Sequence, residues 1–279
     1  MVTHVSVKVP ATSANLGPGF DCLSMALNIW NTVHVEIGSP EFDISGEGSE
    51  TLEAGKGNLI YKSFCLPFQE SGQNVPEIRM FCENAVPIGK GLGSSTAAII
   101  GGLIAGNEIS GRPLSQDAIL ELSDKMEGHA DNAAAAIWGG CQIVVKENSR
   151  LLTSKIQVDE EMSAVLFIPD LNIPTKQSRS LLPTQIGIED AVYNIGRASL
   201  LIKSFATGDF AHMSAATGDK IHQPSRQKIF PAMQAIFKAA MHADALGVFL
   251  SGAGSSVLAL AKGKEISIGY EMAEAASKS

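Results

Sequence analysis

A chain of 279 residues, 45% hydrophobic and 18% charged, is long enough to bury a substantial core and does not have the composition of a disordered protein. Its net charge of -8, with no basic block, argues against nucleic acid as a ligand. The four cysteines form no CxxC pair and no apolar run approaches the roughly 20 residues that span a bilayer, so we expect a soluble cytoplasmic protein without a zinc site, disulfides or membrane contact.

The first half of the chain mixes predicted strands and helices. Valines alternate with polar residues from Val5 to Val9, which predicts an opening strand, and residues 10–20 read as the loop that follows. Ser115 is expected to cap a helix that ends near Met126. Further strands are expected over residues 32–37, 42–47 and 77–83, and further helices over residues 58–70, 94–107 and 131–138.

The second half continues the mixed pattern. Apolar runs predict strands over residues 142–145, 164–168, 248–250 and 256–261, and helices over residues 188–206, 231–243 and 267–277. No low-complexity linker separates the halves. We therefore expect two lobes, residues 1–150 and 151–279, that share one cleft.

Glycines and hydroxyls gather in the segment PIGKGLGSST at residues 87–96, directly before the predicted apolar helix. Glycine lets the backbone approach a phosphate closely, and the free amides at a helix start attract negative charge. The segment fits neither GxxxxGK[ST] nor GxGxxG, so a Walker-type NTPase or a Rossmann dehydrogenase is not supported. Taken alone, such a glycine-rich turn is as often a purely structural connection as a phosphate site.

Other segments make the interpretation specific. The glycine segment resembles the phosphate-binding motif of the galactokinase, homoserine kinase, mevalonate kinase and phosphomevalonate kinase (GHMP) superfamily. VPATSANLGPGFD at residues 9–21 resembles the N-terminal motif of its homoserine kinases almost letter for letter. LSGAGSS at residues 250–256 is similar to the C-terminal motif of the superfamily, although Ser255 replaces the usual proline and predicts a looser turn.

Three further segments separate the subfamilies. EGHADN at residues 127–132 resembles the EGHxDN segment of homoserine kinases, whereas galactokinase-like and mevalonate kinase-like members place an aspartate where the resemblance puts Asn132. NIPTKQSR at residues 172–179 and GDKIHQPSR at residues 218–226 resemble the substrate segments of homoserine kinases. The matches span nearly the whole chain.

The resemblance implies an α+β fold with two lobes. Residues 1–150 would form an ATP-binding lobe like the second domain of ribosomal protein S5, and residues 151–279 a ferredoxin-like GHMP kinase lobe. The chain stops soon after its last predicted helix, where family members usually continue to a final strand, so we expect a shortened C-terminal lobe. Family members commonly pair, which makes a homodimer an expectation here too.

The resemblance also implies an activity: ATP- and Mg²⁺-dependent phosphorylation of the L-homoserine hydroxyl, a step of threonine biosynthesis that gives O-phospho-L-homoserine and ADP. Ser95 and Glu127 would bind the metal. The ATP-binding residues carried over are Pro87, Ile88, Gly89, Lys90, Gly91, Leu92, Gly93, Ser94, Ser95, Thr96, Ala97, Gly252 and Gly254. The substrate-binding residues are Asn15, Asp21, His129, Asn132, Thr175, Arg179 and Arg226, of which Asn15, Asn132 and Arg179 would also be catalytic.

Some of these residues also have structural explanations. His129 could brace its loop, Glu127 could act as a cap, and Asp21 could stabilise a turn. His4, His222 and His242 are taken as ordinary structural histidines. Because the amide of Asn132 cannot take a proton at neutral pH, we expect catalysis by positioning and electrostatics, with the proton leaving through phosphate or solvent.

Two other functions stay open at this point. One is another kinase of the same superfamily that acts on a mevalonate-like alcohol. The residues that argue against it are Asn132, Thr175, Arg179 and Arg226. The other is a non-catalytic nucleotide-binding sensor of the same fold, since a fold does not establish activity. The complete glycine segments and Glu127 argue against that sensor.

Overall fold

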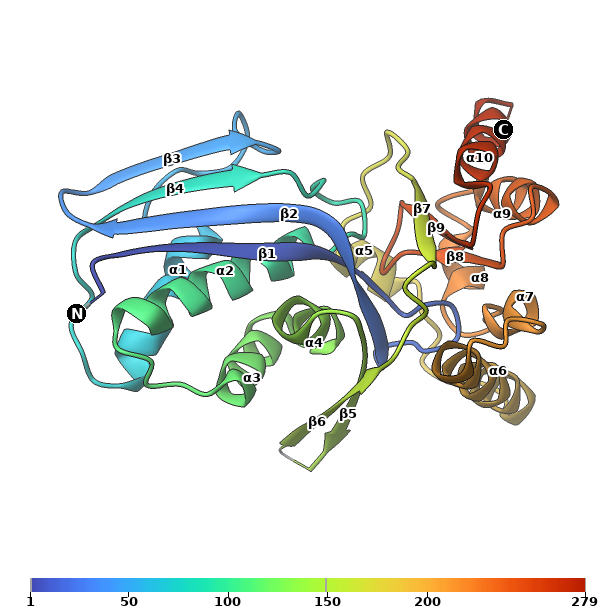
Figure 1. Ribbon diagram of the computed structural model, residues 1–279, viewed down its shortest axis with the longest axis horizontal. Coiled ribbons are helices and arrows are strands. Elements are labelled where there is room, and N and C mark those ends of the chain that lie inside the picture. Colours follow the sequence, from blue (N-terminus) through green and yellow to red (C-terminus); the bar gives the residue numbers. More distant parts are fainter. Residues whose placement is uncertain (1, 149, 279) are drawn as a thin grey trace.

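A six-stranded sheet forms the base of the N-terminal lobe in the computed structural model, which describes residues 2–148 and 150–278 (Figure 1). The strand order is β3-β4-β2-β5-β6, and β1 pairs with β2. Among the strand pairs of the described residues in this sheet, only β3 with β4 is parallel. The strands are β1 (His4–Ala14), β2 (Leu23–Ile37), β3 (Glu41–Gly46), β4 (Ile78–Asn84), β5 (Cys141–Glu147) and β6 (Arg150–Ile156).

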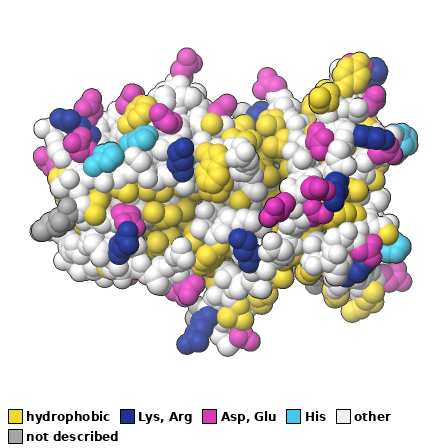
Figure 2. Space-filling model, in the orientation of Figure 1, with side chains coloured by type: hydrophobic (Ala, Val, Ile, Leu, Met, Phe, Trp, Pro, Cys, Tyr) yellow, Lys and Arg dark blue, Asp and Glu magenta, His cyan; other side chains and the backbone are white. Residues whose placement is uncertain are grey.

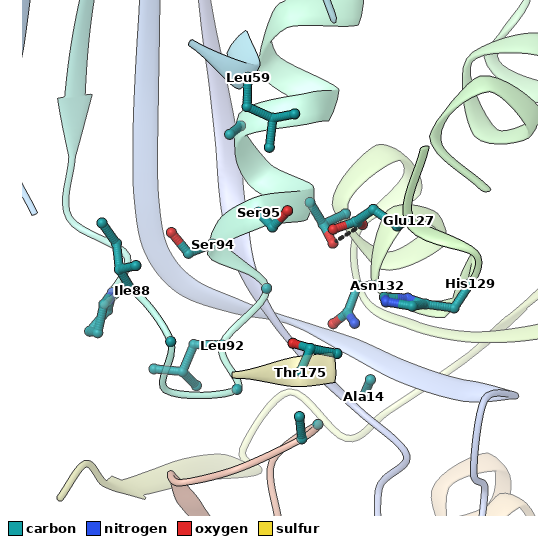
Figure 3. Close-up of a pocket in the computed structure, with 18 of the residues that line it drawn as sticks. Ala14, Leu59, Ile88, Leu92, Ser94, Ser95, Glu127, His129, Asn132 and Thr175 are labelled. Atoms are coloured by element: carbon teal, nitrogen blue, oxygen red, sulfur yellow. Dashed lines mark hydrogen bonds between the residues drawn. The ribbon is translucent and has the colours of Figure 1, made fainter. Parts of the chain in front are cut away.

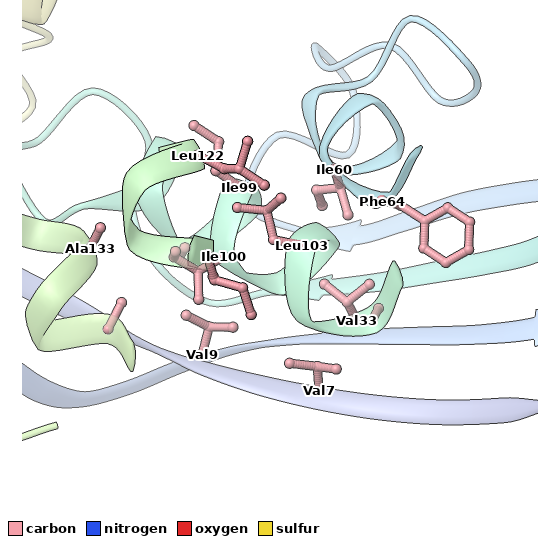
Figure 4. Close-up of a cluster of buried hydrophobic side chains, with 14 of the residues drawn as sticks. Val7, Val9, Val33, Ile60, Phe64, Ile99, Ile100, Leu103, Leu122 and Ala133 are labelled. Carbon is pink, nitrogen blue, oxygen red and sulfur yellow. The ribbon is translucent and has the colours of Figure 1, made fainter. Parts of the chain in front are cut away.

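Helices α1 to α4 lie together on one side of the sheet (Figure 1). They are α1 (Leu59–Glu70), α2 (Ser94–Ile109), α3 (Gln116–Glu127) and α4 (Asp131–Trp138). Figure 4 shows the resulting core, in which Val9 and Val33 of the sheet face Ile100 of α2. α2 packs closely on α1, because a Cβ at Gly102 would lie 2.2 Å from the carbonyl oxygen of Ile60. This packing fixes the start of α2, where the glycine segment lies.

The C-terminal lobe has a three-stranded antiparallel sheet in the order β7-β9-β8. The apolar core of this lobe forms where the sheet packs against α9 and α10. A second hydrophobic cluster joins the lobes, since it contains Leu23 and Ile156 together with Leu201 and Phe249. The elements are β7 (Ser163–Phe167), α5 (Thr175–Ser180), α6 (Ile188–Thr207), α7 (Met213–Ala216), α8 (Gln223–Arg226), α9 (Met233–His242), β8 (Gly247–Leu250), β9 (Val257–Ala261) and α10 (Glu265–Ser277).

The α+β arrangement predicted from the sequence is confirmed, but one predicted loop is wrong. Residues 10–14 belong to β1, where Ala11 and Ala14 pair with Leu27 and Ser24 of β2. The register shifts between Pro10 and Ala11, so the strand continues past the proline through an irregularity. Four further elements were not predicted from the sequence: β6, α5, α7 and α8.

The predicted division at residues 150 and 151 falls at the start of β6. This strand pairs with β5 along its whole length, from Arg150 opposite Glu147 to Ile156 opposite Cys141. The sheet of the N-terminal lobe therefore extends to Ile156. A boundary in the segment after β6 suits the strand pairing better, and we propose it there.

The surface seen in Figure 2 carries Lys and Arg side chains interspersed with Asp and Glu, while hydrophobic side chains gather near the middle of the molecule. Within residues 2–148 and 150–278, no helix combines the length and the apolar character needed to cross a bilayer.

Candidate active site

A cavity of about 420 Å³ lies where the two lobes meet, and segments far apart in the sequence line it (Figure 3). The end of β1, the glycine segment and the turn between α3 and α4 come from the N-terminal lobe. α5, Arg226 of α8 and the loop after β8 come from the C-terminal lobe. Both lobes are needed to complete the site.

The glycine segment leaves the start of α2 open to a ligand. Gly93 is the N-cap residue with a φ of 70°, and no side chain caps the first amides of the helix. Thr12 donates its backbone N–H to the carbonyl of Leu92, and the hydroxyl of Ser251 donates to the carbonyl of Gly91. The free amides are therefore held against β1 and the loop after β8, and they form a site for an anionic group.

A carboxylate lies near this helix start. Glu127, at the end of α3, accepts a hydrogen bond of 2.5 Å from the hydroxyl of Thr96, drawn as a dashed line in Figure 3. The Ser95 hydroxyl lines the same cavity. Residues 2–148 and 150–278 contain no group of three His, Cys, Asp or Glu side chains that could hold a metal. The pair Ser95 and Glu127 fits Mg²⁺, which binds through few protein oxygens and keeps its other positions for water and phosphate.

The turn before α4 and the first turn of α4 place an imidazole and an amide at the cavity. Asn132 accepts a 2.8 Å hydrogen bond from the hydroxyl of Thr12 through its Oδ1 atom. Asp131 is buried, and its Oδ1 atom lies 3.1 Å from Nδ1 of His129. Burial opposes the charged form of His129, but the hydrogen bond and charge of Asp131 and the charge of Glu127 outweigh it and raise its pKa.

A bidentate ion pair links the two lobes across the cavity. Arg179 of α5 donates to both carboxylate oxygens of Asp21, at 2.9 and 2.7 Å. The hydrogen bonds that Arg179 donates to Asp21 raise the pKa of Arg179. Asn15, predicted to bind substrate, uses both ends of its amide within the protein, because Nδ2 donates to the carbonyl of Gly252 and Oδ1 accepts from the backbone N–H of Asp21.

Arg226 is a deeply buried cation of the site, with 2% of its surface exposed. Its Nε atom donates to Ser178 Oγ at 2.7 Å, and its Nη1 atom donates to His222 Nδ1 at 2.6 Å and to the carbonyl of Gly252 at 2.9 Å. Burial, followed by the nearby charge of Arg179, lowers the pKa of Arg226 to about 10. It remains a cation at neutral pH.

The structure brings most of the predicted site residues to the cavity wall, including the predicted substrate-binding residues, Ser95 and Glu127. Lys90, Ala97 and Gly254 do not line it. Lys90 donates to the carbonyl of Pro169 at 2.9 Å, and Ala97 faces the core. Without the usual proline, the turn at Ser255 was expected to be looser. Ser255 is buried, and its hydroxyl donates to the carbonyl of Leu171, which stabilises the turn.

Part of the cavity lining and several supporting side chains were not predicted from the sequence. Most of the missed lining residues lie outside the recognised segments and meet only through folding: Asn31, Leu52, Glu53, Gly57, Asn58, Leu59, Ile60, Asn84 and Ala98. Ala14, Asp131, Ile173 and Ala253 line the cavity from inside recognised segments but were not predicted as site residues. Among the supports, Thr12 and His222 lie inside recognised segments. The spacing of four between His222 and Arg226 is a helical contact spacing and was the available signal.

Comparison with known proteins identifies the family. Residues 58–140 match the GHMP kinases N terminal domain and residues 201–277 match the GHMP kinases C terminal model. The chain is 39% identical over 270 residues to the homoserine kinase of Moorella thermoacetica, covering 96% of this chain and 91% of that protein. It is also 39% identical over 264 residues to the homoserine kinase of Microchaete diplosiphon, covering 94% and 86%.

A solved structure agrees with these matches over the full length. The crystal structure of homoserine kinase from Cytophaga hutchinsonii has a TM-score of 0.89 and 28% sequence identity, and the match covers 100% of this chain and 92% of that one. The chain therefore belongs to the GHMP kinase family, within its homoserine kinase branch.

Proposed function

We propose that this protein transfers the γ-phosphoryl group of ATP to the side-chain hydroxyl of L-homoserine and releases O-phospho-L-homoserine and ADP. The observation that carries the proposal is one cavity whose lining has two chemically different parts. The open start of α2 is one part, and the cations Arg179 and Arg226, with the carboxylate of Asp21, are the other. The curated relatives are homoserine kinases, and we assign that activity to this chain.

The part of the cavity lined by Arg179, Arg226 and Asp21 suits a small amino acid. Arg226 offers a guanidinium with no carboxylate in ion-pair contact within residues 2–148 and 150–278, so a substrate carboxylate would be its first anionic partner. Asp21 is the acceptor for a substrate ammonium, and Arg179, its present partner, is released to the carboxylate in the same exchange. Thr175, at the first position of α5, also lines the cavity.

The start of α2 suits the phosphates of ATP. The amides at the start of α2 would bind the negative charge that increases as the phosphoryl group is transferred. Ser95 and Glu127 would hold Mg²⁺, whose chemistry is to neutralise charge on the phosphate oxygens. Thr96 keeps the carboxylate of Glu127 in place through its hydroxyl.

Catalysis by positioning follows from the residue at 132. The Oδ1 atom of Asn132 already accepts from Thr12, and an amide does not take up a proton at neutral pH. The role of Asn132 is therefore to orient the substrate hydroxyl, and its proton leaves through phosphate or solvent.

The deciding experiment measures ADP release from ATP with homoserine, mevalonate, galactose or no acceptor, each with and without Mg²⁺. We expect turnover with homoserine alone and only with Mg²⁺. Turnover with mevalonate in place of homoserine would refute the substrate assignment. ATP binding without turnover on any acceptor would favour a non-catalytic sensor. Pairing of two copies stays a prediction, to be tested by the mass of the protein in solution.

A further inference from the structure

The planar guanidinium of Arg226 is held in place by neutral acceptors. Ser178 Oγ accepts from Nε, while His222 Nδ1 and the carbonyl of Gly252 accept from Nη1. No hydrogen bond within residues 2–148 and 150–278 uses Nη2. The three contacts fix the plane of the guanidinium and leave Nη2 as the donor for a ligand in the cavity.

The contacts of His222 define a single tautomer. A guanidinium N–H can only donate, so Nδ1 of His222 must carry a lone pair. The proton is then on Nε2, which donates to the carbonyl of Gly17 at 2.7 Å. Asp219 Oδ2 lies 3.6 Å from Nε2, beyond hydrogen-bond distance, and is occupied by the backbone N–H groups of His222 and Gln223. Burial lowers the pKa of His222 to about 4, which agrees with a neutral ring.

The same ring also contacts the loop that carries Asp21. Gly17 lies in this loop, and its conformation leaves no room for a side chain, because a Cβ there would lie 2.3 Å from the carbonyl oxygen of Thr217. The ring of Phe20 lies 5.5 Å from the ring of His222. The Cζ atoms of Arg179 and Arg226 lie 5.6 and 5.8 Å from the centre of the Phe20 ring.

We propose that His222 is a positioning residue for recognition of the substrate carboxylate. Its Nδ1 atom orients Arg226, and the hydrogen bond from its Nε2–H group to the carbonyl of Gly17 keeps the ring in the tautomer that leaves Nδ1 free to accept. The inference rests on the proposed function, because it assumes that Arg226 binds the carboxylate of homoserine. It replaces the expectation that His222 is an ordinary structural histidine.

The test compares His222→Asn with His222→Leu. The two side chains have nearly the same shape, but only Asn offers an acceptor close to the position of Nδ1, and neither reaches Gly17. Each variant is assayed with homoserine and with 3-amino-1-propanol, which has the same hydroxyl and ammonium but no carboxylate. KM for ATP is measured alongside.

We expect His222→Leu to lower kcat/KM for homoserine by about tenfold to a hundredfold, because it leaves a buried donor of Arg226 unpaired. The loss should be in KM rather than kcat, and kcat/KM for 3-amino-1-propanol should change by less than about threefold. His222→Asn should recover most of the loss. Equal losses on both acceptors, or equal losses in both variants, would overturn the inference and leave the proposed function standing.

Two further measurements keep the outcome decisive. If His222→Leu does not fold, Ser178→Ala removes the acceptor of Nε instead and should show the same carboxylate-specific loss. An unchanged preference for homoserine in that variant would count against orientation of Arg226 by its neutral acceptors. A wild-type protein that does not phosphorylate homoserine would overturn both the proposed function and the inference.

Discussion

The contact between the glycine segment and the loop after β8 can be tested with one methyl group. Gly91 has a φ of 74°, and a Cβ there would lie 2.2 Å from the carbonyl oxygen of Ser251 and 2.8 Å from the backbone of Gly254. These are backbone atoms, so they cannot move aside as a flexible side chain would. Gly91→Ala should therefore separate the two loops and disturb the start of α2.

Gly89→Ala provides a matched control. Gly89 has a φ of 69°, almost that of Gly91, but a Cβ there would meet only Asn172, at an ordinary 3.6 Å. Both variants have the cost of a left-handed conformation, about 1–2 kcal/mol. Only Gly91→Ala adds an overlap, which costs about 1–3 kcal/mol when a packed region must shift. The expected losses in free energy of unfolding are about 1–2 kcal/mol at Gly89 and about 2–5 kcal/mol at Gly91.

Urea unfolding of the two variants without ligand measures this difference directly. KM for ATP is the second measurement, and we expect it to rise about tenfold in Gly91→Ala because the amides of α2 lose their alignment. Equal losses of stability in the two variants would refute the idea that close packing of the two loops holds the phosphate site.

Three other predictions follow from the site. Glu127→Gln should lower turnover at least about tenfold at ordinary Mg²⁺ concentrations, measured as ADP release over an Mg²⁺ titration, and unchanged turnover would remove Glu127 from the metal site. Arg179→Lys removes the planar guanidinium that would bind the substrate carboxylate through two hydrogen bonds after the exchange with Asp21, and should raise KM for homoserine about tenfold with KM for ATP unchanged. His129, whose pKa is raised, contributes stability fully below about pH 6.5 that is lost as the pH rises through its folded pKa, so the melting temperature difference between wild type and His129→Gln should be larger at pH 6 than at pH 9.

Local signals predicted the elements that local chemistry controls. Ser115 accepts from the backbone N–H of Ala118 as expected of an N-cap, and the predicted helix over residues 131–138 is α4. Residues 10–14 were predicted as loop because proline and small polar residues mimic a turn, but pairing with β2 makes them a strand. Such pairing depends on distant residues, and propensity does not predict it.

In the site, as in the fold, local sequence predicted some features and long-range contacts determine the others. The motifs supplied the residues, but their partners come from folding: Asp21 and Arg179 are 158 positions apart and still form a bidentate pair. Asn31 accepts from the backbone N–H groups of Ala85 and Val86. It lines the cavity but lies outside the recognised motifs. Its amide supports the approach to the glycine segment, a role visible only when β2 and the end of β4 lie together.

The charges of the site explain how an acidic protein could select an amino acid over other anions. Arg179 is neutralised by Asp21, whereas Arg226, which lines the same cavity, has no ion-pair partner within residues 2–148 and 150–278. A zwitterion could exchange the internal pair for two external ones, its ammonium on Asp21 and its carboxylate on the guanidinium groups, and leave no charge alone. An alcohol with a carboxylate but no ammonium could reach the guanidinium of Arg179 only by leaving Asp21 unpaired, which is costly in a half-buried site. Selectivity against mevalonate-like acceptors would then come from Asp21 as much as from the two arginines.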